Sequence, residues 1–221
     1  MVKKVLITGA AGNIGASIAK RFTLDGYVIC TPSRLELNLN SIDSIKCFFK
    51  INKNFDILIN NAGINEISNF TEFSVASVEK VVMTNLTSPA LLSKYVIPHM
   101  SKNNWGRIVN ISSIYSKISR SKRVLYTMTK SGLNGLTVGL ANEYARDGIL
   151  VNAVLPGFVD TELTRKNNSP EDINKLCAER IPIGRLSTVD EVADFVFYLG
   201  TVNNTYITGQ TIAIDGGVLT L

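Results

Sequence analysis

Short aliphatic runs alternate along the chain with longer stretches whose apolar positions recur at helical spacing. Six runs have the length and β-branched content of strands, at residues 3–8, 27–31, 55–60, 106–112, 149–155 and 210–215. The helical stretches cover residues 14–25, 41–53, 72–102, 126–147 and 188–200. Continuously apolar strands need cover on both faces, which helices on both sides of a parallel sheet provide. The pattern predicts a doubly wound α/β fold of three layers, α/β/α, with right-handed crossovers.

The chain contains no repeat, low-complexity segment or linker that would divide it. We therefore interpret residues 1–221 as one domain, a size that supports one well-packed core. The least regular stretch is 160–185, which includes KNNSPEDINK and predicts a mobile flap. Pro89 predicts a kink in helix 72–102.

Composition excludes several classes of protein. The formal charge is +5, from 23 Lys and Arg against 18 Asp and Glu, with no long basic run, so nucleic-acid binding is not indicated. No apolar run is long enough to span a bilayer, and the first one stops at Thr8-Gly9, too early for a signal peptide. The cysteines are odd in number and lack metal-site spacing, which predicts a reducing cytoplasm and no metal (Cys30, Cys47 and Cys177).

A glycine-rich turn, TGAAGNIG, follows the first predicted strand and opens a helix. This is the context that a dinucleotide fingerprint requires. Gly9 allows the tight turn, Gly12 lets the backbone approach a pyrophosphate, and Gly15 lets the helix pack close to the sheet. The amides at the helix start, at Asn13 and Ile14, then face the phosphates. The alternative is that these glycines only reverse the chain.

The residues after the second strand bear on the choice of cofactor. A Rossmann protein that binds NAD places an acid there to hold the ribose diol. This chain has Ser33 and Arg34, which suit a 2′-phosphate better, while Glu36 lies slightly too far along. The sequence therefore favours NADP and leaves NAD possible. Alternatively, Arg34 is only a solvated loop residue.

Tyr126 and Lys130 lie four residues apart, on one face of a predicted helix. A cation near a phenol favours the phenolate and lowers its pKa by about 1–3 units, which makes the tyrosine a usable acid–base group. Ser113 follows strand 106–112, at the edge of the sheet where a ligand crevice forms. Taken alone, Tyr-x-x-x-Lys also arises by chance as an exposed pair.

Several motifs in a fixed order resemble the short-chain dehydrogenase/reductase family over nearly the whole chain. They are NNAG (60–63), TNL (84–86), ISS (111–113), YTMTK (126–130), VNAVLPGFVDTEL (151–163) and YITGQTIAIDGG (206–217), together with the glycine turn. Among family members, the 3-oxoacyl-carrier-protein reductases look most similar in motif spacing.

The resemblance implies a role for each matching residue. Tyr126 would protonate the substrate carbonyl, Ser113 would orient it, and Lys130 would hold the nicotinamide ribose and lower the Tyr126 pKa. Asn85 would help to hold a water that relays protons to Lys130. Further cofactor contacts are implied on the adenosine side for Asn61, Ala62 and Gly63, at adenine for Asn38, and around the nicotinamide carboxamide and pyrophosphate for Pro156, Gly157, Val159 and Thr161.

Two departures from the family pattern matter. Asn13 stands where short members carry their second glycine, a spacing more typical of the longer branch that modifies sugar nucleotides. After Arg34 the chain moves almost directly to LNLNSIDSI, so we expect a reduced second crossover and third strand.

Three glycines recur at helical spacing after Lys130, at Gly132, Gly135 and Gly139. Each costs about 1 kcal/mol relative to alanine in a helix, so close packing must offset the loss. Relatives form dimers and tetramers through this helix and the long one before it, which implies a homo-oligomer. Packing within one chain is the alternative.

Basic residues gather between Ser113 and Tyr126, at Lys117, Arg120, Lys122 and Arg123. Either they only solvate the surface, or they attract an anionic substrate that is free or bound to a carrier. Tyr115, where relatives often have small residues, predicts a narrower pocket.

These observations predict an NADP-dependent oxidoreductase that transfers hydride between nicotinamide and a carbonyl or secondary alcohol. The favoured substrate is a 3-oxoacyl thioester. A dehydrogenase of a sugar or sugar phosphate is the alternative among enzymes. A nucleotide-sensing regulator without catalysis is the alternative of another class. No role is assigned to His99.

Overall fold

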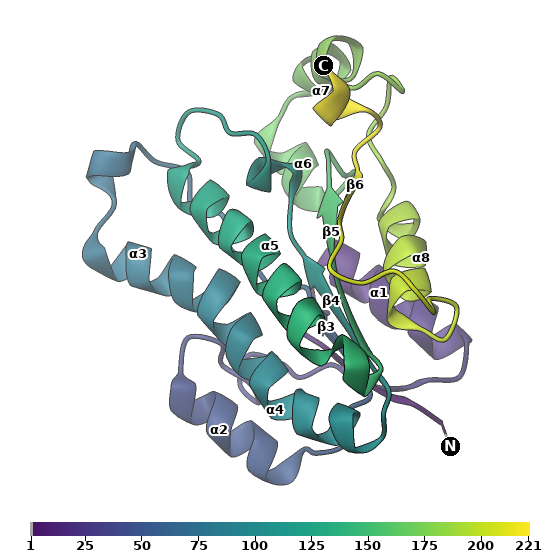
Figure 1. The fold of residues 1–221 in the computed structure, drawn as a ribbon. Coiled ribbons are helices and arrows are strands. Elements are labelled where there is room, and N and C mark those ends of the chain that lie inside the picture. Colours follow the sequence, from purple (N-terminus) through teal and green to yellow (C-terminus); the bar gives the residue numbers. More distant parts are fainter. Residues whose placement is uncertain (1) are drawn as a thin grey trace.

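A computed structural model describes residues 2–221, apart from the side chains of Leu163 and Asn167. Its centre is a six-stranded sheet in the order β2-β1-β3-β4-β5-β6, in which all neighbouring strands are parallel (Figure 1). This confirms the predicted doubly wound α/β fold. The strands are β1 (Lys4–Ile7), β2 (Val28–Cys30), β3 (Ile57–Asn60), β4 (Gly106–Ile111), β5 (Ile149–Pro156) and β6 (Thr211–Ile214).

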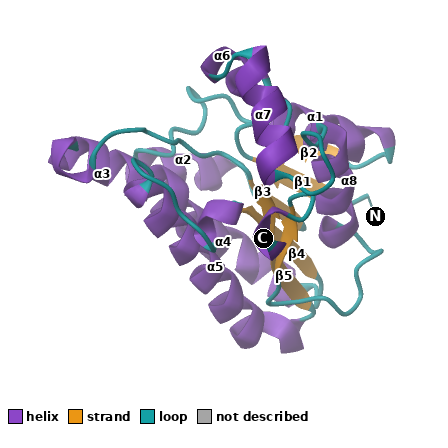
Figure 2. Ribbon diagram, turned by 90° about the horizontal axis from the view of Figure 1, so that it is seen from above, coloured by secondary structure: helices purple, strands orange, loops and turns teal. Residues whose placement is uncertain are grey.

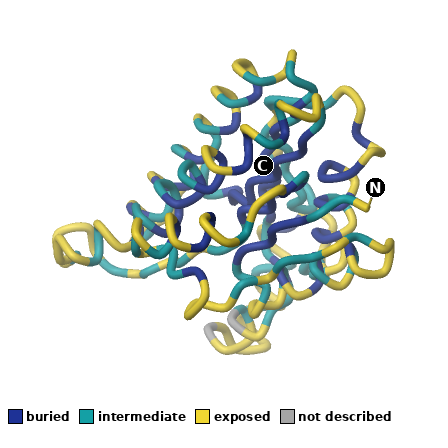
Figure 3. The backbone as a smooth tube through the Cα atoms, turned by 90° about the horizontal axis from the view of Figure 1, so that it is seen from below, coloured by how far each residue is buried: buried dark blue, intermediate teal, exposed yellow. Residues whose placement is uncertain are grey.

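Helices cover both faces of the sheet, as Figure 2 shows from above. On one face, α1 (Asn13–Leu24) and α8 (Val189–Gly200) bury Phe22 and Val196 against the strands. On the other face, α2 (Ile42–Ile51), α4 (Ser88–Lys102) and α5 (Val124–Tyr144) close a second cluster around Phe48 and Leu92. The central strands β1, β3, β4 and β5 are therefore buried from both sides, as their apolar residues require, whereas the edge strands β2 and β6 are only partly buried (Figure 3).

The strand order reverses between β1 and β3, because the chain adds β2 on one side of β1 and β3 on the other. Ligands of open parallel sheets bind at the carboxyl ends of strands beside such a reversal. The segment after β1 begins at Thr8 and the segment after β3 begins at Asn61, so the glycine turn and the NNAG motif flank this point.

The reduced second crossover is confirmed. Within the described residues, α2 is the only regular element between β2 and β3, and no strand pairs with the outer side of β2. With three residues, β2 is a short edge strand.

The predicted helix 72–102 is interrupted. A 3₁₀ turn, η1 (Phe70–Glu72), precedes α3 (Val75–Val82), and a π-helical turn, η2 (Met83–Thr87), joins α3 to α4. Pro89 has no N–H for the carbonyl four residues earlier, and its ring clashes there in a regular helix. The Ser88 amide instead donates to the Met83 carbonyl, five residues back, so the predicted kink takes the form of a π turn.

The prediction that 160–185 is the least regular stretch was wrong, while the mobility of this flap stays a prediction. This stretch forms α6 (Glu162–Asn167) and α7 (Pro170–Arg180). Ser169 caps α7, with Pro170 in its first turn, and it exchanges hydrogen bonds with Asp172 in a capping box. The local sequence SPED carried this signal.

Three-residue 3₁₀ turns complete the secondary structure: η3 (Ile114–Ser116) follows β4, η4 (Ala145–Asp147) follows α5 and η5 (Val218–Thr220) ends the chain. Ile114 and Val218 pack with Ile181, just after α7, in a small third cluster. None of the helices in the described part of the chain combines the length and apolar character needed to cross a membrane.

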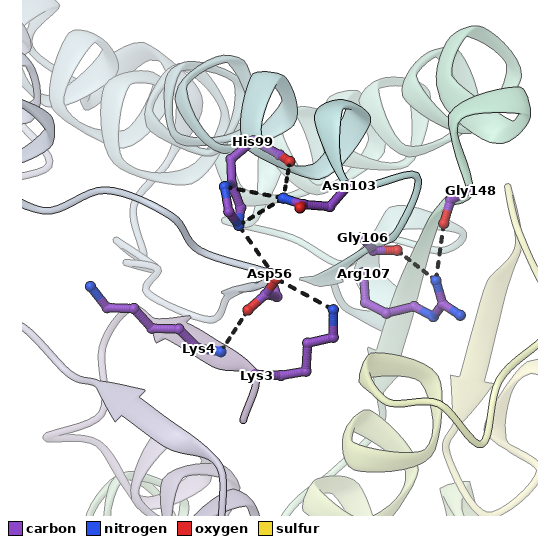
Figure 4. A network of polar contacts seen from close by, with 8 residues as sticks. All are labelled: Lys3, Lys4, Asp56, His99, Asn103, Gly106, Arg107 and Gly148. Carbon is purple, nitrogen blue, oxygen red and sulfur yellow. Dashed lines mark hydrogen bonds and ion pairs between the residues drawn. The ribbon is translucent and has the colours of Figure 1, made fainter. Parts of the chain in front are cut away.

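Asp56 contacts three side or main chains at the end of the sheet opposite the crevice, from Lys3, Lys4 and His99 (Figure 4). Its carboxylate accepts a 2.9 Å hydrogen bond from the Lys4 amide and lies 3.5 Å from the Lys3 ammonium. His99, to which the sequence assigned no role, places Nε2 3.4 Å from the same carboxylate.

We expect Asp56→Ala to lower the free energy of unfolding by about 2 kcal/mol, because it removes the acceptor of a partly buried amide. Urea denaturation measures the change. Asp56→Asn keeps an acceptor and should lose less. Asp43 forms only an exposed ion pair with Lys46, so Asp43→Asn is the control. If Asp56→Ala lowers the free energy of unfolding no more than Asp43→Asn does, the contacts of Asp56 do not stabilise the fold as expected.

Candidate active site

A cleft of about 1020 Å³ opens at the carboxyl ends of the strands. Its walls come from the segments after β1, β2, β3, β4 and β5 and from the start of α5. It is lined by all the predicted site residues except Asn85: Gly9, Gly12, Asn13, Ile14, Gly15, Ser33, Arg34, Asn38, Asn61, Ala62, Gly63, Ser113, Tyr126, Lys130, Pro156, Gly157, Val159 and Thr161. Asn85 is fully buried behind this wall.

The chain itself requires two of the glycines in the first turn. Gly9 has φ +69°, and a β-carbon there would lie 2.9 Å from the Ala62 α-carbon. A β-carbon at Gly15 would lie 2.3 Å from the Gly9 carbonyl oxygen. The Asn61 amide group donates to the carbonyl oxygens of Thr8, at 3.0 Å, and Gly9, at 3.1 Å. The NNAG segment therefore holds the glycine turn in place.

Gly12 differs, because nothing in the chain demands it. A β-carbon at this position would meet only the Gly9 oxygen, at an ordinary 3.6 Å. Gly12 is the N-cap of α1, which has no side-chain cap and no acidic residue in its first turn. The first amides of a helix lack acceptors within the helix. The space above Gly12 and these amides fit a phosphate group.

The turn after β2 is shaped by Ser33 and Glu36. The Ser33 amide donates to the Glu36 carboxylate at 2.8 Å, which lowers the pKa of that carboxyl, and the Glu36 amide donates to the Ser33 hydroxyl at 3.4 Å. Glu36 thus stabilises the turn that carries Arg34. Arg34 is exposed at the cleft and takes part in none of the ion pairs found among the described residues.

Ser113 and Tyr126 meet at the other end of the cleft. Ser113 is buried just past β4, where its hydroxyl accepts the Tyr115 amide at 3.2 Å. Tyr126 lies in the first turn of α5, and the Ser113 side chain is near enough to lower the pKa of its phenol. Lys130, one turn later and 3% exposed, has its ammonium 5.6 Å from the centre of the Tyr126 ring.

The expected direction of the Tyr126 pKa was wrong for the structure as it stands. Desolvation by the surrounding protein raises this pKa, while the Ser113 side chain and the Arg123 charge lower it to a smaller extent. Lys130 is not among the groups that lower it. Burial instead lowers the pKa of Lys130 itself to about 8. Its ammonium donates to the Ile111 carbonyl at 2.7 Å.

Asn85 and Lys130 face the same small space. A β-carbon added at Gly63 would lie 3.4 Å from the Lys130 nitrogen and 3.5 Å from the Asn85 side-chain oxygen. That oxygen accepts the Ile64 amide at 2.8 Å, and the Asn85 nitrogen donates to the Ile64 carbonyl at 2.8 Å. Asn85 lies in the π turn, a helical form that is frequent at functional sites.

Buried polar bonds fix α5 to the sheet and thereby position Tyr126 and Lys130. The side-chain nitrogen of Asn110, in β4, donates to the Thr137 hydroxyl at 2.9 Å. The Ser112 hydroxyl donates to the Lys130 carbonyl at 3.1 Å. Gly132 also brings α5 close to the π turn, because a β-carbon there would lie 2.9 Å from the Leu86 side chain.

Sequence reasoning missed two supporting residues. The Thr8 hydroxyl accepts the amides of Asn61 and Ala62, each at 3.1 Å. The Thr129 hydroxyl accepts the Asn85 amide at 3.1 Å. Thr8 could have been suspected, since it is a polar residue that ends an apolar strand directly before a glycine turn. Nothing in the sequence distinguishes Thr129 from a solvated helix residue.

A parallel sheet with a phosphate-sized cradle after β1 and a Ser–Tyr–Lys group across the same cleft defines the class of nicotinamide-dependent oxidoreductases. The family model described as Enoyl-(Acyl carrier protein) reductase matches residues 35–219. The chain belongs to the short-chain dehydrogenase/reductase family, and it is an oxidoreductase of that family.

Similar proteins differ in their named substrates. The chain is 38% identical to the 3-oxoacyl-[acyl-carrier-protein] reductase FabG of Aquifex aeolicus (strain VF5) over 218 residues, 97% of this chain and 86% of that protein. The structure of ElxO with NADP bound has a TM-score of 0.89 and 32% identity, covering all of both chains. A gluconate 5-dehydrogenase from Burkholderia cenocepacia J2315, in complex with NADP and tartrate, has a TM-score of 0.87 and 26% identity, covering 99% and 96%.

Proposed function

We propose that the protein is an NADPH-dependent reductase of 3-oxoacyl thioesters. The observation that carries the proposal is the joining of Ser113, Tyr126 and Lys130 at one end of a cleft whose other end presents Arg34. The similarity to a FabG over nearly the whole chain supports this substrate class. The solved relatives that contain NADP support the cofactor.

The side chains divide the reaction between them. When bound, the nicotinamide supplies the hydride. The Tyr126 hydroxyl donates a proton to the substrate oxygen as negative charge develops there, and the Ser113 hydroxyl donates a hydrogen bond to the same oxygen. Lys130 would hold the nicotinamide ribose, and its ammonium would return a proton to Tyr126 through a water that Asn85 helps to hold, since Lys130 and Asn85 both lie next to Gly63.

These residues share one cleft, so each is available for the cofactor contact that the family resemblance implies. The α1 amides at Asn13, Ile14 and Gly15, next to Gly9 and Gly12, would hold the pyrophosphate. Asn38, Asn61, Ala62 and Gly63 would hold the adenosine side. Pro156, Gly157, Val159 and Thr161 would hold the carboxamide and pyrophosphate, and Thr161 also caps α6 by accepting the Thr164 amide at 3.2 Å.

The substrate is tested by measuring NADPH oxidation with an acetoacetyl thioester, and NADP⁺ reduction with gluconate and a sugar phosphate. Preference for the thioester supports the proposal. The second candidate is a sugar-acid or sugar-phosphate dehydrogenase, favoured by the spacing of Gly9, Gly12 and Gly15 and by the gluconate dehydrogenase among the similar structures. Cofactor binding without turnover of any carbonyl or alcohol would indicate a nucleotide sensor.

We expect Arg34→Ala to raise KM for NADPH by about 10-fold or more, because a charge-assisted bond to the 2′-phosphate is worth about 1.5–3 kcal/mol. KM for NADH should change little, since NADH lacks that phosphate. Steady-state kinetics with both cofactors measure the split. Lys20→Ala, in the exposed face of α1, is the matched control. Equal changes for NADH and NADPH would remove Arg34 from cofactor selection.

The glycines of α5 support a homo-oligomer. Gly132 packs within the chain, whereas β-carbons at Gly135 and Gly139 would meet no described atom within 4 Å. The latter two leave a smooth open strip that a second copy can pack against. Light scattering across a dilution series measures the association. We further propose that the chain acts as one domain in the cytoplasm, with its three cysteines free as in the structure.

A further inference from the structure

Arg123 differs from the other cations of the basic segment 117–123. Lys117, Arg120 and Lys122 are exposed, whereas Arg123 is partly buried. Its Nε atom is buried and has no hydrogen-bond partner among the residues that the structure describes. Within residues 2–221, Arg123 takes part in none of the observed ion pairs. It is thus a partly desolvated cation without a counter-charge.

The fold places this cation next to the reacting group. Arg123 is the N-cap of α5, three residues before Tyr126. Its guanidinium carbon lies 6.0 Å from the centre of the Tyr115 ring, and that ring meets Tyr126 edge to face at 6.3 Å. Tyr115 lines the cleft. Tyr115 and Tyr126 therefore line the substrate end of the cleft, and Arg123 lies beside Tyr115 without being one of the lining residues.

The loop before Arg123 is held against α5. The Ser131 hydroxyl donates to the Ser116 carbonyl at 3.1 Å, and the hydroxyls of Ser119 and Thr127 lie 2.9 Å apart. Lys122, directly before Arg123, has φ +67°. A left-handed lysine is costly and is kept only where the surrounding structure enforces it. This strained turn sets the direction in which Arg123 leaves the loop.

A cation in this position stabilises negative charge nearby. Partial burial lowers the pKa of Arg123, which reflects the cost of removing its charge from water. A guanidinium recovers that cost when it donates to a carboxylate or phosphate, to which its planar donors are matched. Tyr115 supplies an aromatic wall beside the same position.

We propose that Arg123 binds an anionic oxygen of the substrate beside Tyr115 and makes the site selective for substrates that carry one. This inference rests on the proposed function, since it concerns the substrate of the same site. The anion has two possible sources: a carboxylate on a short oxo acid, or a phosphate on the pantetheine arm of a thioester.

The test compares Arg123→Gln with Arg120→Gln, which removes the same charge from an exposed position of the same segment. Three substrates are reduced with NADPH: acetoacetate, acetoacetyl-coenzyme A and the neutral N-acetylcysteamine thioester of acetoacetate. We expect Arg123→Gln to raise KM about 10- to 100-fold for acetoacetate or for acetoacetyl-coenzyme A, and to leave the neutral thioester unchanged. The affected substrate identifies the source of the anion. Arg123→Lys, which keeps the charge without the fork, should recover part of the loss.

Two results would overturn the role of Arg123. An equal effect of Arg120→Gln would show that the segment acts only through long-range attraction. An equal loss on the neutral thioester would show that Arg123 supports the fold of the site.

Titration calorimetry of acetoacetate and of coenzyme A into the protein saturated with NADP⁺ needs no turnover. If the wild-type protein reduces none of the three substrates, the proposed function fails. The Arg123 inference then stands if either anion binds wild type more tightly than Arg123→Gln, and fails if neither does.

Discussion

Tyr126→Phe is expected to lower kcat by about 10²- to 10⁴-fold, the usual contribution of a positioned proton donor. The substitution removes only the phenolic oxygen next to Ser113, and with it the proton given to the substrate. The Tyr115 ring should still meet the residue-126 ring edge to face, because both rings remain. The loss should therefore fall on kcat, with KM for NADPH nearly unchanged.

The measurement is steady-state oxidation of NADPH, varied in concentration at a saturating 3-oxoacyl thioester, which gives kcat and KM for NADPH. Tyr144→Phe is a matched control, because it makes the same chemical change at the far end of the same helix. Ser113→Ala should lose less than Tyr126→Phe, since it removes a hydrogen bond and leaves the proton donor. If Tyr126→Phe retains wild-type kcat, the assignment of the acid–base group is wrong.

The fold could be predicted because its signals are local and repeated. Each strand is a separate apolar run, and each predicted strand and helix found a counterpart in the structure within a few residues. The π turn at 83–87 could not be predicted, since Pro89 indicates a disturbance but does not determine its form. The α7 helix was missed, although Ser169, Pro170 and Asp172 form a recognisable N-terminal capping sequence.

The site divides in the same manner. The lining residues follow from motif order and from the ends of parallel strands, so nearly all of them share one cleft. The electrostatics do not follow, because they depend on burial. The spacing of Tyr126 and Lys130 suggested that the cation governs the phenol, but in the structure desolvation dominates both groups. The acceptor of Lys130 is the backbone carbonyl of Ile111, which no side-chain pattern reveals.

Lys130→Met is expected to abolish most activity while making the protein more stable at pH 7. Lys130 is 3% exposed, and burial lowers the pKa of its ammonium from 10.5 to about 8. This shift corresponds to about 3 kcal/mol of penalty on the charged, folded form. Methionine removes this penalty. It also removes the hydrogen bond to the Ile111 carbonyl, which lowers the stability by about 1–2 kcal/mol. The net expected gain in the free energy of unfolding is about 1–2 kcal/mol.

The pH dependence separates this explanation from a general packing effect. Below pH 8 both folded and unfolded wild-type protein carry the proton, so the folded state bears the whole penalty. Between pH 8 and 10.5 the unfolded chain binds more protons at this residue than the folded one, and the Lys130 contribution to stability therefore rises with pH. The advantage of Lys130→Met should shrink across that window, as measured by urea denaturation at several pH values. If the stability advantage of Lys130→Met stays constant with pH, its cause is packing. If the variant is less stable than wild type at pH 7, the hydrogen bond of the ammonium to Ile111 contributes more than the burial of the charge costs.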